Sequence, residues 1–204
     1  MYPCRRGGVR AGGIHLSSVL IGIIGIALFM GIAIGSAVFL GPRFEDAQSQ
    51  SLGSTSVQAV SNVAAAVSSF RMATGYGYGP GLENTQKLVD GGYLRSVPSN
   101  PVATGRDPQI VGSNGLDYSA TPAAQQSSWS PKFVYMSIGT DRFVCDQVLR
   151  MLGYMSSGDS MNPNTTYDPS VGGDQRPAGC FRTNAASSQI ASGDYVVYAR
   201  VGGA

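Results

Sequence analysis

The sequence predicts an α+β protein, with one long N-terminal helix followed by a domain of short strands and helices. Positions 14–40 form an uncharged, mostly apolar run, after which apolar residues recur every three or four positions as far as Phe70. Such spacing is typical of one face of a helix. After residue 75 short apolar stretches alternate with Gly, Pro and polar residues, as expected for a small mixed domain.

The apolar run predicts a transmembrane helix within segment 14–41. Val19 to Leu40 are 22 positions interrupted only by glycines and Ser36, and about 20 apolar residues suffice to span a bilayer. Three arginines lie in the preceding segment, 1–13. The positive-inside rule then leaves this tail in the cytoplasm and exports the rest of the chain.

The junction between tail and helix allows three interpretations. An ordinary cleaved signal peptide is disfavoured, because the apolar core is too long and no suitable small-residue cleavage site follows it. An uncleaved signal anchor is the second. In the third, a basic leader ends at Gly12-Gly13, and cleavage there leaves the helix on the mature protein.

Glycines within the apolar run indicate helix–helix packing. Gly31 and Gly35 form a G-x-x-x-G motif, which lets helix backbones approach closely. Gly22 and Gly25 add to this pattern. The simpler alternative is that glycine is common in transmembrane helices.

Segment 42–74 is predicted to continue the helix in amphipathic form. We expect Gly41-Pro42 to interrupt the helix and the pattern to resume from about 55 to 73. Candidate N-cap residues precede that range: Ser54, Thr55 and Ser56.

Segment 75–204 is predicted to be the globular part. Its glycine-rich start, 75–81, lacks the Lys-Ser/Thr of a phosphate-binding loop. Helices are expected over 83–90 and from Thr140 or Asp141 to about Met155. A hairpin turn at Ser113-Asn114-Gly115 is expected to join 110–111 to 116–118. Strands are expected over 133–138 and 195–201, and a long loop over 156–177.

Composition excludes several functions. Charged residues make up 13% of the chain, and without the three N-terminal arginines eleven basic residues face twelve acidic ones, so no nucleic-acid partner is predicted. The only histidine, His15, lies at the start of the apolar run. A Ser-His-Asp or Cys-His site and a His-ligated zinc site are therefore excluded from the exported part. Asp141 and Asp146 would face different sides of a helix. We predict neither enzyme activity nor a cofactor.

Two of the three cysteines are predicted to form a disulfide. Cys4 lies on the cytoplasmic side, whereas Cys145 and Cys180 lie in the exported part, where disulfides persist. The alternative is a pair of buried free thiols. A disulfide closing a loop of this length would stabilise the fold by roughly 3–4 kcal/mol.

In their order, these features resemble the type IV pilin family. The basic leader, Gly13, the long apolar helix, its amphipathic continuation and the late cysteine pair follow the family's sequence. The closer likeness is to type IVb pilins of the toxin-coregulated and conjugative thin-pilus kinds. There a strand leads into a helix carrying the first cysteine, as in FVYMSIGTDRFVCDQVLRML (133–152), and the second comes late, as in AGCF (178–181).

The resemblance implies a structure and a life cycle. The long helix would pack on an antiparallel sheet, with a C-terminal disulfide in the globular head. A prepilin peptidase would cut after Gly13, or after Gly12, and Ile14 would become the methylated N-terminus. The single-pass precursor would wait in the bacterial inner membrane, and the pilus assembly machinery would then move it from lipid into a homo-oligomeric extracellular filament for adhesion or conjugation-type contact.

One position departs from the family. Pilins usually carry glutamate at the fifth mature position, which here is Ser18. A hydroxyl cannot replace a carboxylate that pairs with an amine. This departure favours a minor pilin or a divergent system, and a type II secretion pseudopilin remains an alternative. Outside the family, the alternative is a signal-anchored periplasmic binding module that does not polymerise.

Overall fold

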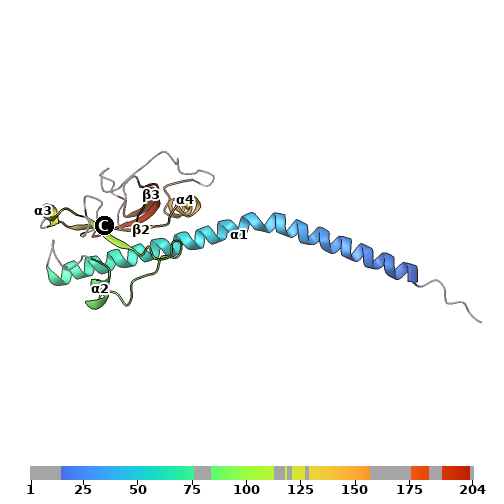
Figure 1. The fold of residues 1–204 in the computed structure, drawn as a ribbon, viewed down its shortest axis with the longest axis horizontal. Helices are drawn as coiled ribbons and strands as arrows, with labels where there is room; N and C mark the ends of the chain where they lie inside the picture. The colour runs from blue at the N-terminus through green and yellow to red at the C-terminus, as the bar shows by residue number, and fades with distance from the viewer. Residues whose placement is uncertain are drawn as a thin grey trace, which may run out of the picture. The chain divides into compact units, whose positions relative to one another are not determined.

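The computed structural model is an α+β fold with a four-stranded antiparallel sheet and a disulfide (Figure 1). It divides into two compact units, Met1–Asp46 and Ala47–Ala204, described separately below. The residues that the structure describes are 15–75, 84–112, 118, 121–126, 129–156, 176–183 and 190–202, with the side chains of 15–19 and 36–42 left aside.

Helix α1 runs without a break from His15 to Thr74. The predicted interruption at Gly41-Pro42 is therefore wrong. A proline removes one backbone donor, and the hydrogen bonds of the turns on either side of it can still carry the helix through. Within the part of the chain that the structure describes, no helix has both the length and the hydropathy needed to cross a membrane.

The predicted helix start near residue 55 is also wrong. Ser54 and Thr55 lie inside α1, and both side-chain hydroxyls donate to the carbonyl oxygen of Ser51 at 2.9 Å. An N-cap serves the free N–H groups at the start of a helix. Inside α1 these N–H groups already donate to carbonyl oxygens of the preceding turn. The two hydroxyls therefore donate to a backbone carbonyl oxygen one turn earlier in the helix.

The sheet has the order β1-β2-β4-β3, and every neighbouring pair is antiparallel. Two strands confirm the predicted ones: β2 (Pro131–Ser137) and β4 (Tyr195–Arg200). Strand β3 (Ala178–Arg182) was not predicted, and β1 (Gln109–Gly112) pairs with β2. The expected partner of β1 was 116–118, of which only Tyr118 is described, in a turn. The hairpin residues Ser113–Gly115 lie outside the described residues.

Three short helices complete the described fold: α2 (Gln86–Asp90), α3 (Ala123–Gln126) and α4 (Arg142–Met151). Helix α4 begins where predicted but ends four residues early. Gly153 has a φ of +75°, and the backbone N–H groups of Leu152 and Gly153 close the last turn on Val148 and Arg150. This is the left-handed glycine ending common at helix C-termini.

Both faces of the sheet are buried. One face packs against the 47–74 part of α1 and against α4, through Val60, Val63 and Val67 of α1 and Val144 and Val148 of α4. This confirms the apolar face predicted for the second half of α1. The opposite face carries four aromatic rings whose contacting pairs have centroids 5.3–6.5 Å apart: Phe133, Tyr135, Phe181 and Tyr198.

Candidate functional site

The predicted cleavage site, Gly13 and Ile14, lies outside the described residues. The helix that follows it is described from His15 onward. The expected loop over 75–81 is described only at Gly75, and the loop over 156–177 only at its two ends. The predictions for the cleavage site and for these two loops therefore remain predictions.

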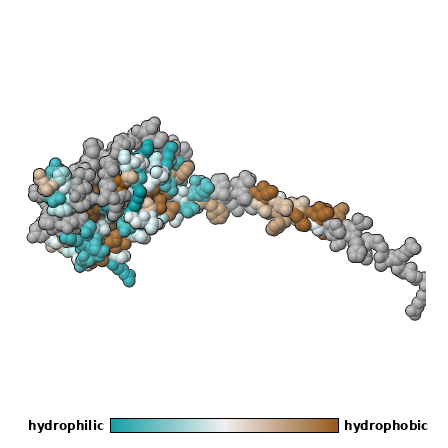
Figure 2. Space-filling model, viewed as in Figure 1, coloured by the Kyte–Doolittle hydropathy of each residue, from teal (hydrophilic) through white to brown (hydrophobic). Residues whose placement is uncertain are grey.

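The N-terminal part of α1 presents an apolar surface. All described side chains from 20 to 35 are exposed, and none is charged. Phe29 is 75% exposed and Ile32 is 70% exposed, and the described part of this segment is coloured mainly as hydrophobic in Figure 2. A run of this kind is far more apolar than the surface of an ordinary soluble helix.

The four predicted packing glycines lie on this exposed segment. At Gly22, Gly25, Gly31 and Gly35 an added Cβ would meet no atom within 4 Å. Nothing in the described single chain therefore requires glycine at these positions. Open space beside a glycine leaves room for a second helix backbone.

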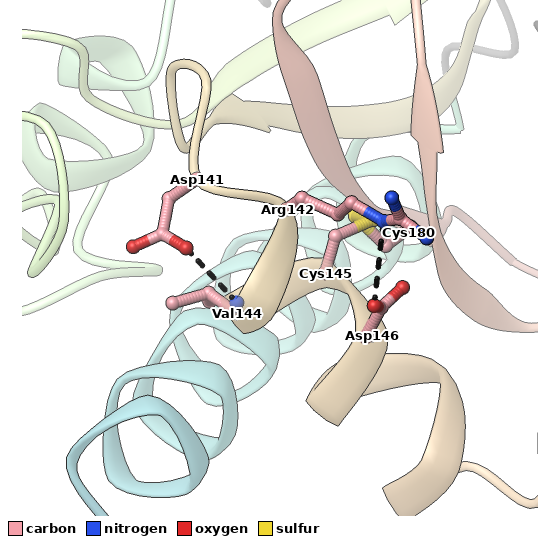
Figure 3. The surroundings of a disulfide bond; sticks show 6 residues. All are labelled: Asp141, Arg142, Val144, Cys145, Asp146 and Cys180. Atoms are coloured by element: carbon pink, nitrogen blue, oxygen red, sulfur yellow. Dashed lines mark hydrogen bonds and ion pairs between the residues drawn. A yellow bond between two sulfur atoms is a disulfide. The ribbon is translucent and has the colours of Figure 1, made fainter. Parts of the chain in front are cut away.

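The disulfide joins Cys145 of α4 to Cys180 of β3 (Figure 3). The Cα atoms are 5.5 Å apart, within the range for disulfides. Both residues are buried. The predicted disulfide is thus confirmed, and it fixes α4 on the same sheet face that contacts α1.

The two aspartates of the α4 region have separate structural roles, as Figure 3 shows. The carboxylate of Asp141 accepts a hydrogen bond from the backbone N–H of Val144 at 3.2 Å, so Asp141 is the N-cap of α4. Asp146 is buried and lies 3.6 Å from the guanidinium of Arg142. The two carboxylates do not meet. Among the described residues, no group of three or more His, Cys, Asp or Glu side chains could hold a metal ion.

Gly53 allows α1 and α4 to approach closely. A Cβ at this position would lie 3.3 Å from Cγ2 of Val148 and 3.5 Å from the carbonyl oxygen of Val144. This contact was not predicted from the sequence. The signal was a glycine inside an amphipathic helical pattern, but nothing in the pattern identifies α4 as its partner.

A buried polar network ties the loop before β1 to the ends of β2 and β4. The carboxylate of Asp194 accepts hydrogen bonds from the guanidinium of Arg106, the hydroxyl of Ser137 and the backbone N–H of Ala191. Asn100 donates to the carbonyl oxygens of Arg106 and Ser137. The network satisfies groups removed from water and holds the loop in place. Its three central side chains, those of Arg106, Ser137 and Asp194, are 31 to 88 residues apart in the sequence, so no local pattern predicts their contact.

The described features are an exposed apolar helix surface, a close helix–helix contact and a disulfide. No family model, no curated protein and no solved structure matches the chain.

Proposed function

We propose that this chain is a structural subunit of a type IV pilus, closest to the type IVb pilins, and that a prepilin peptidase removes its basic leader. Before assembly the apolar half of α1 resides in the bacterial inner membrane. In the filament, the same half packs among the α1 helices of other copies. The filament then serves adhesion or conjugation-type surface contact.

The observation that carries this proposal is the exposed, uncharged surface of α1 from 20 to 35, continuous with a helix that forms the core of the second unit. Exposure of so many apolar side chains to water is unfavourable. The free energy of the system falls when lipid or other apolar chains cover them. One covalently continuous helix thus combines a part that needs other molecules with a part that organises the head.

The head supports the same proposal. Its sheet packs on α1, and its disulfide fixes α4 beside α1. A head held in this way suits a subunit that leaves the membrane and then remains outside the cell, where disulfides persist.

A minor pilin or a type II secretion pseudopilin is the second candidate, and Ser18 is the observation that favours it. Where a glutamate would neutralise the N-terminal amine of a neighbouring subunit, Ser18 offers only a hydroxyl. An uncompensated charge in an apolar environment is costly. A subunit needed in few copies tolerates that cost better than one repeated along the whole filament.

The test is the intact mass of the membrane-extracted full chain, produced with and without a cognate prepilin peptidase. We expect the peptidase to remove MYPCRRGGVRAGG and one methyl group to be added at Ile14. Loss of one residue fewer would place the cut after Gly12. A full-length mass in both samples would contradict the proposal and favour a signal-anchored module.

A further inference from the structure

A groove lies between α1 and the segment that follows α2. Its volume of about 540 Å³ is within the usual size range of small-molecule sites. Positions one helical turn apart on α1 form one wall, and residues of the segment 93–98 form the other. The side chains that matter for binding are Asn62, Ala65 and Ser69 of the first wall and Tyr93, Arg95 and Ser96 of the second.

The second wall is held in place at both ends. At its start, the backbone N–H groups of Tyr93 and Leu94 donate to the carbonyl oxygen of Leu88 at 2.8 and 3.0 Å. The Tyr93 ring also contacts the ring of Phe70 on α1 edge to face, with centroids 5.4 Å apart. Just beyond its end, Asn100 is buried and belongs to the polar network described above. The groove is therefore formed before any ligand arrives, which reduces the free-energy cost of binding.

The polar side chains of the groove are available to a ligand. Asn62, Ser69, Arg95 and Ser96 are exposed, and in the part of the chain that the structure describes their side chains make no hydrogen bond and no ion pair. Arg95 is the only charged residue of the described lining. A guanidinium only donates and can hold a carboxylate through two parallel hydrogen bonds. Amide and hydroxyl groups, by contrast, both donate and accept.

This combination is complementary to a sugar ring that carries a carboxylate. Such a ring presents several hydroxyl groups, which donate and accept, and apolar C–H surfaces between them. Ala65 and the ring of Tyr93 supply apolar surface in the groove, and a few polar groups on an apolar lining are typical of a specific small-molecule site. A simple carboxylate would engage Arg95 alone. An acidic peptide offers carboxylates but few hydroxyl groups, so it would leave the amide and hydroxyls of the groove to water.

We propose that this groove binds a carboxylate-bearing sugar, with Arg95 on the carboxylate and Asn62, Ser69 and Ser96 on the ring hydroxyls. The proposal names a chemistry for the surface contact made by the filament, and for that setting it rests on the proposed function. Binding itself needs only the folded head, so it can be measured without a filament.

The test is isothermal titration calorimetry of the full chain in detergent micelles with digalacturonate, in which each sugar ring carries a carboxylate. Neutral galactobiose is the comparison for the charge, and tri-aspartate is the comparison for the sugar ring. We expect digalacturonate to bind about tenfold or more tightly than either of them, because only this probe uses both the guanidinium and the hydroxyl and amide groups of the groove.

Two variants test the groove itself. Arg95→Gln should weaken the binding of digalacturonate about tenfold, as expected for loss of a charge-assisted pair, and Ala65→Leu should abolish it, because the larger side chain fills the groove. The matched controls are Arg43→Gln and Ala47→Leu, at exposed positions of α1 outside the groove, and both should bind as the unaltered chain does. Urea unfolding of each variant shows whether its head is folded.

Several results would overturn the site. These are no binding of digalacturonate by the folded chain, equal binding of galactobiose, equal binding of tri-aspartate, or equal losses from the groove variants and their controls. Electron microscopy and the mass measurement separate this proposal from the pilus proposal. Filaments without binding would overturn the groove alone, and binding by a chain that keeps its leader and forms no filaments would overturn the pilus alone.

Discussion

The ring of Tyr198 in β4 lies directly against the backbone of Gly179, its partner in β3. A Cβ at residue 179 would come within 2.8 Å of Cε1 and 2.9 Å of the hydroxyl oxygen of Tyr198. Tyr198 is buried and contacts three other rings, so a shift of its ring would disturb the packing of the whole cluster. Glycine at 179 is thus a steric requirement of the aromatic cluster.

Gly179→Ala should lower the free energy of unfolding by about 1–3 kcal/mol, the usual cost of overpacking a filled core. Fluorescence of Trp129, the only tryptophan and a buried one, reports unfolding in urea. The control is the same change with Tyr198→Leu, which removes the obstructing ring. An equal penalty in both backgrounds would contradict the steric explanation.

Asp194→Asn should destabilise the head by about 1–3 kcal/mol, because the neutral side chain loses its ion pair with Arg106 and a buried group is left poorly satisfied. Asp90→Asn is the control, since Asp90 is exposed and an amide oxygen can still accept the hydrogen bond from Gln86. Urea unfolding would measure both. Equal stability of the two variants would mean that the network contributes nothing measurable.

Removing the N-cap of α4 should cost about 0.5–2 kcal/mol. Asp141→Ala deletes the oxygen that accepts from the N–H of Val144, whereas Asp141→Ser keeps an acceptor at the same position. We expect thermal unfolding to separate the two variants. If alanine and serine behave alike, the cap has no role in stability.

Replacing both Cys145 and Cys180 by alanine should lower stability by about 2–5 kcal/mol. Reduction of the unaltered protein should produce a loss of similar size, and the reductant should then leave the double variant unchanged. Urea titrations with and without reductant give all four values. A reductant effect that persists in the double variant would place its cause elsewhere in the chain.

Gly13→Leu should block leader removal and filament assembly while membrane insertion continues. A bulky side chain at the cleavage position would exclude the peptide from the peptidase, while the apolar run remains intact. Mass spectrometry of the membrane fraction and electron microscopy would follow the two steps. Gly7→Leu, within the leader and away from the junction, is the control. Normal processing of Gly13→Leu would show that the cut lies elsewhere.

Local patterns predicted much of this fold. Helical spacing identified the buried face of α1 at Val60, Val67 and their neighbours, and Asp141 was placed correctly at the start of α4. The cysteine pair followed from the predicted compartment and from the order of the cysteines in the chain. In the first two cases the physical cause acts over a few residues; in the third it is the oxidising compartment that the sequence predicts.

The failures have a different origin. Strand β3 is only five residues long and contains Gly179, so its local sequence does not favour a strand, and pairing with β4 makes it one. The partner of β1 is β2, whose first residue lies 19 positions beyond the end of β1. The contacts of Gly53 and Asp194 depend on which elements meet. The sequence determines such tertiary contacts, but no local pattern in it indicates which elements form them.

The position of β4 in the sheet has a consequence for the timing of folding. It is the last element that the structure describes, yet it lies between β2 and β3 and is the only described neighbour of β3. During synthesis β1, β2 and β3 are made before β4, so β3 has no described partner in the sheet until β4 has emerged. The described sheet is therefore complete only once β4 is present, so deletion of residues 195–204 should leave β3 without its described partner and prevent the head from folding.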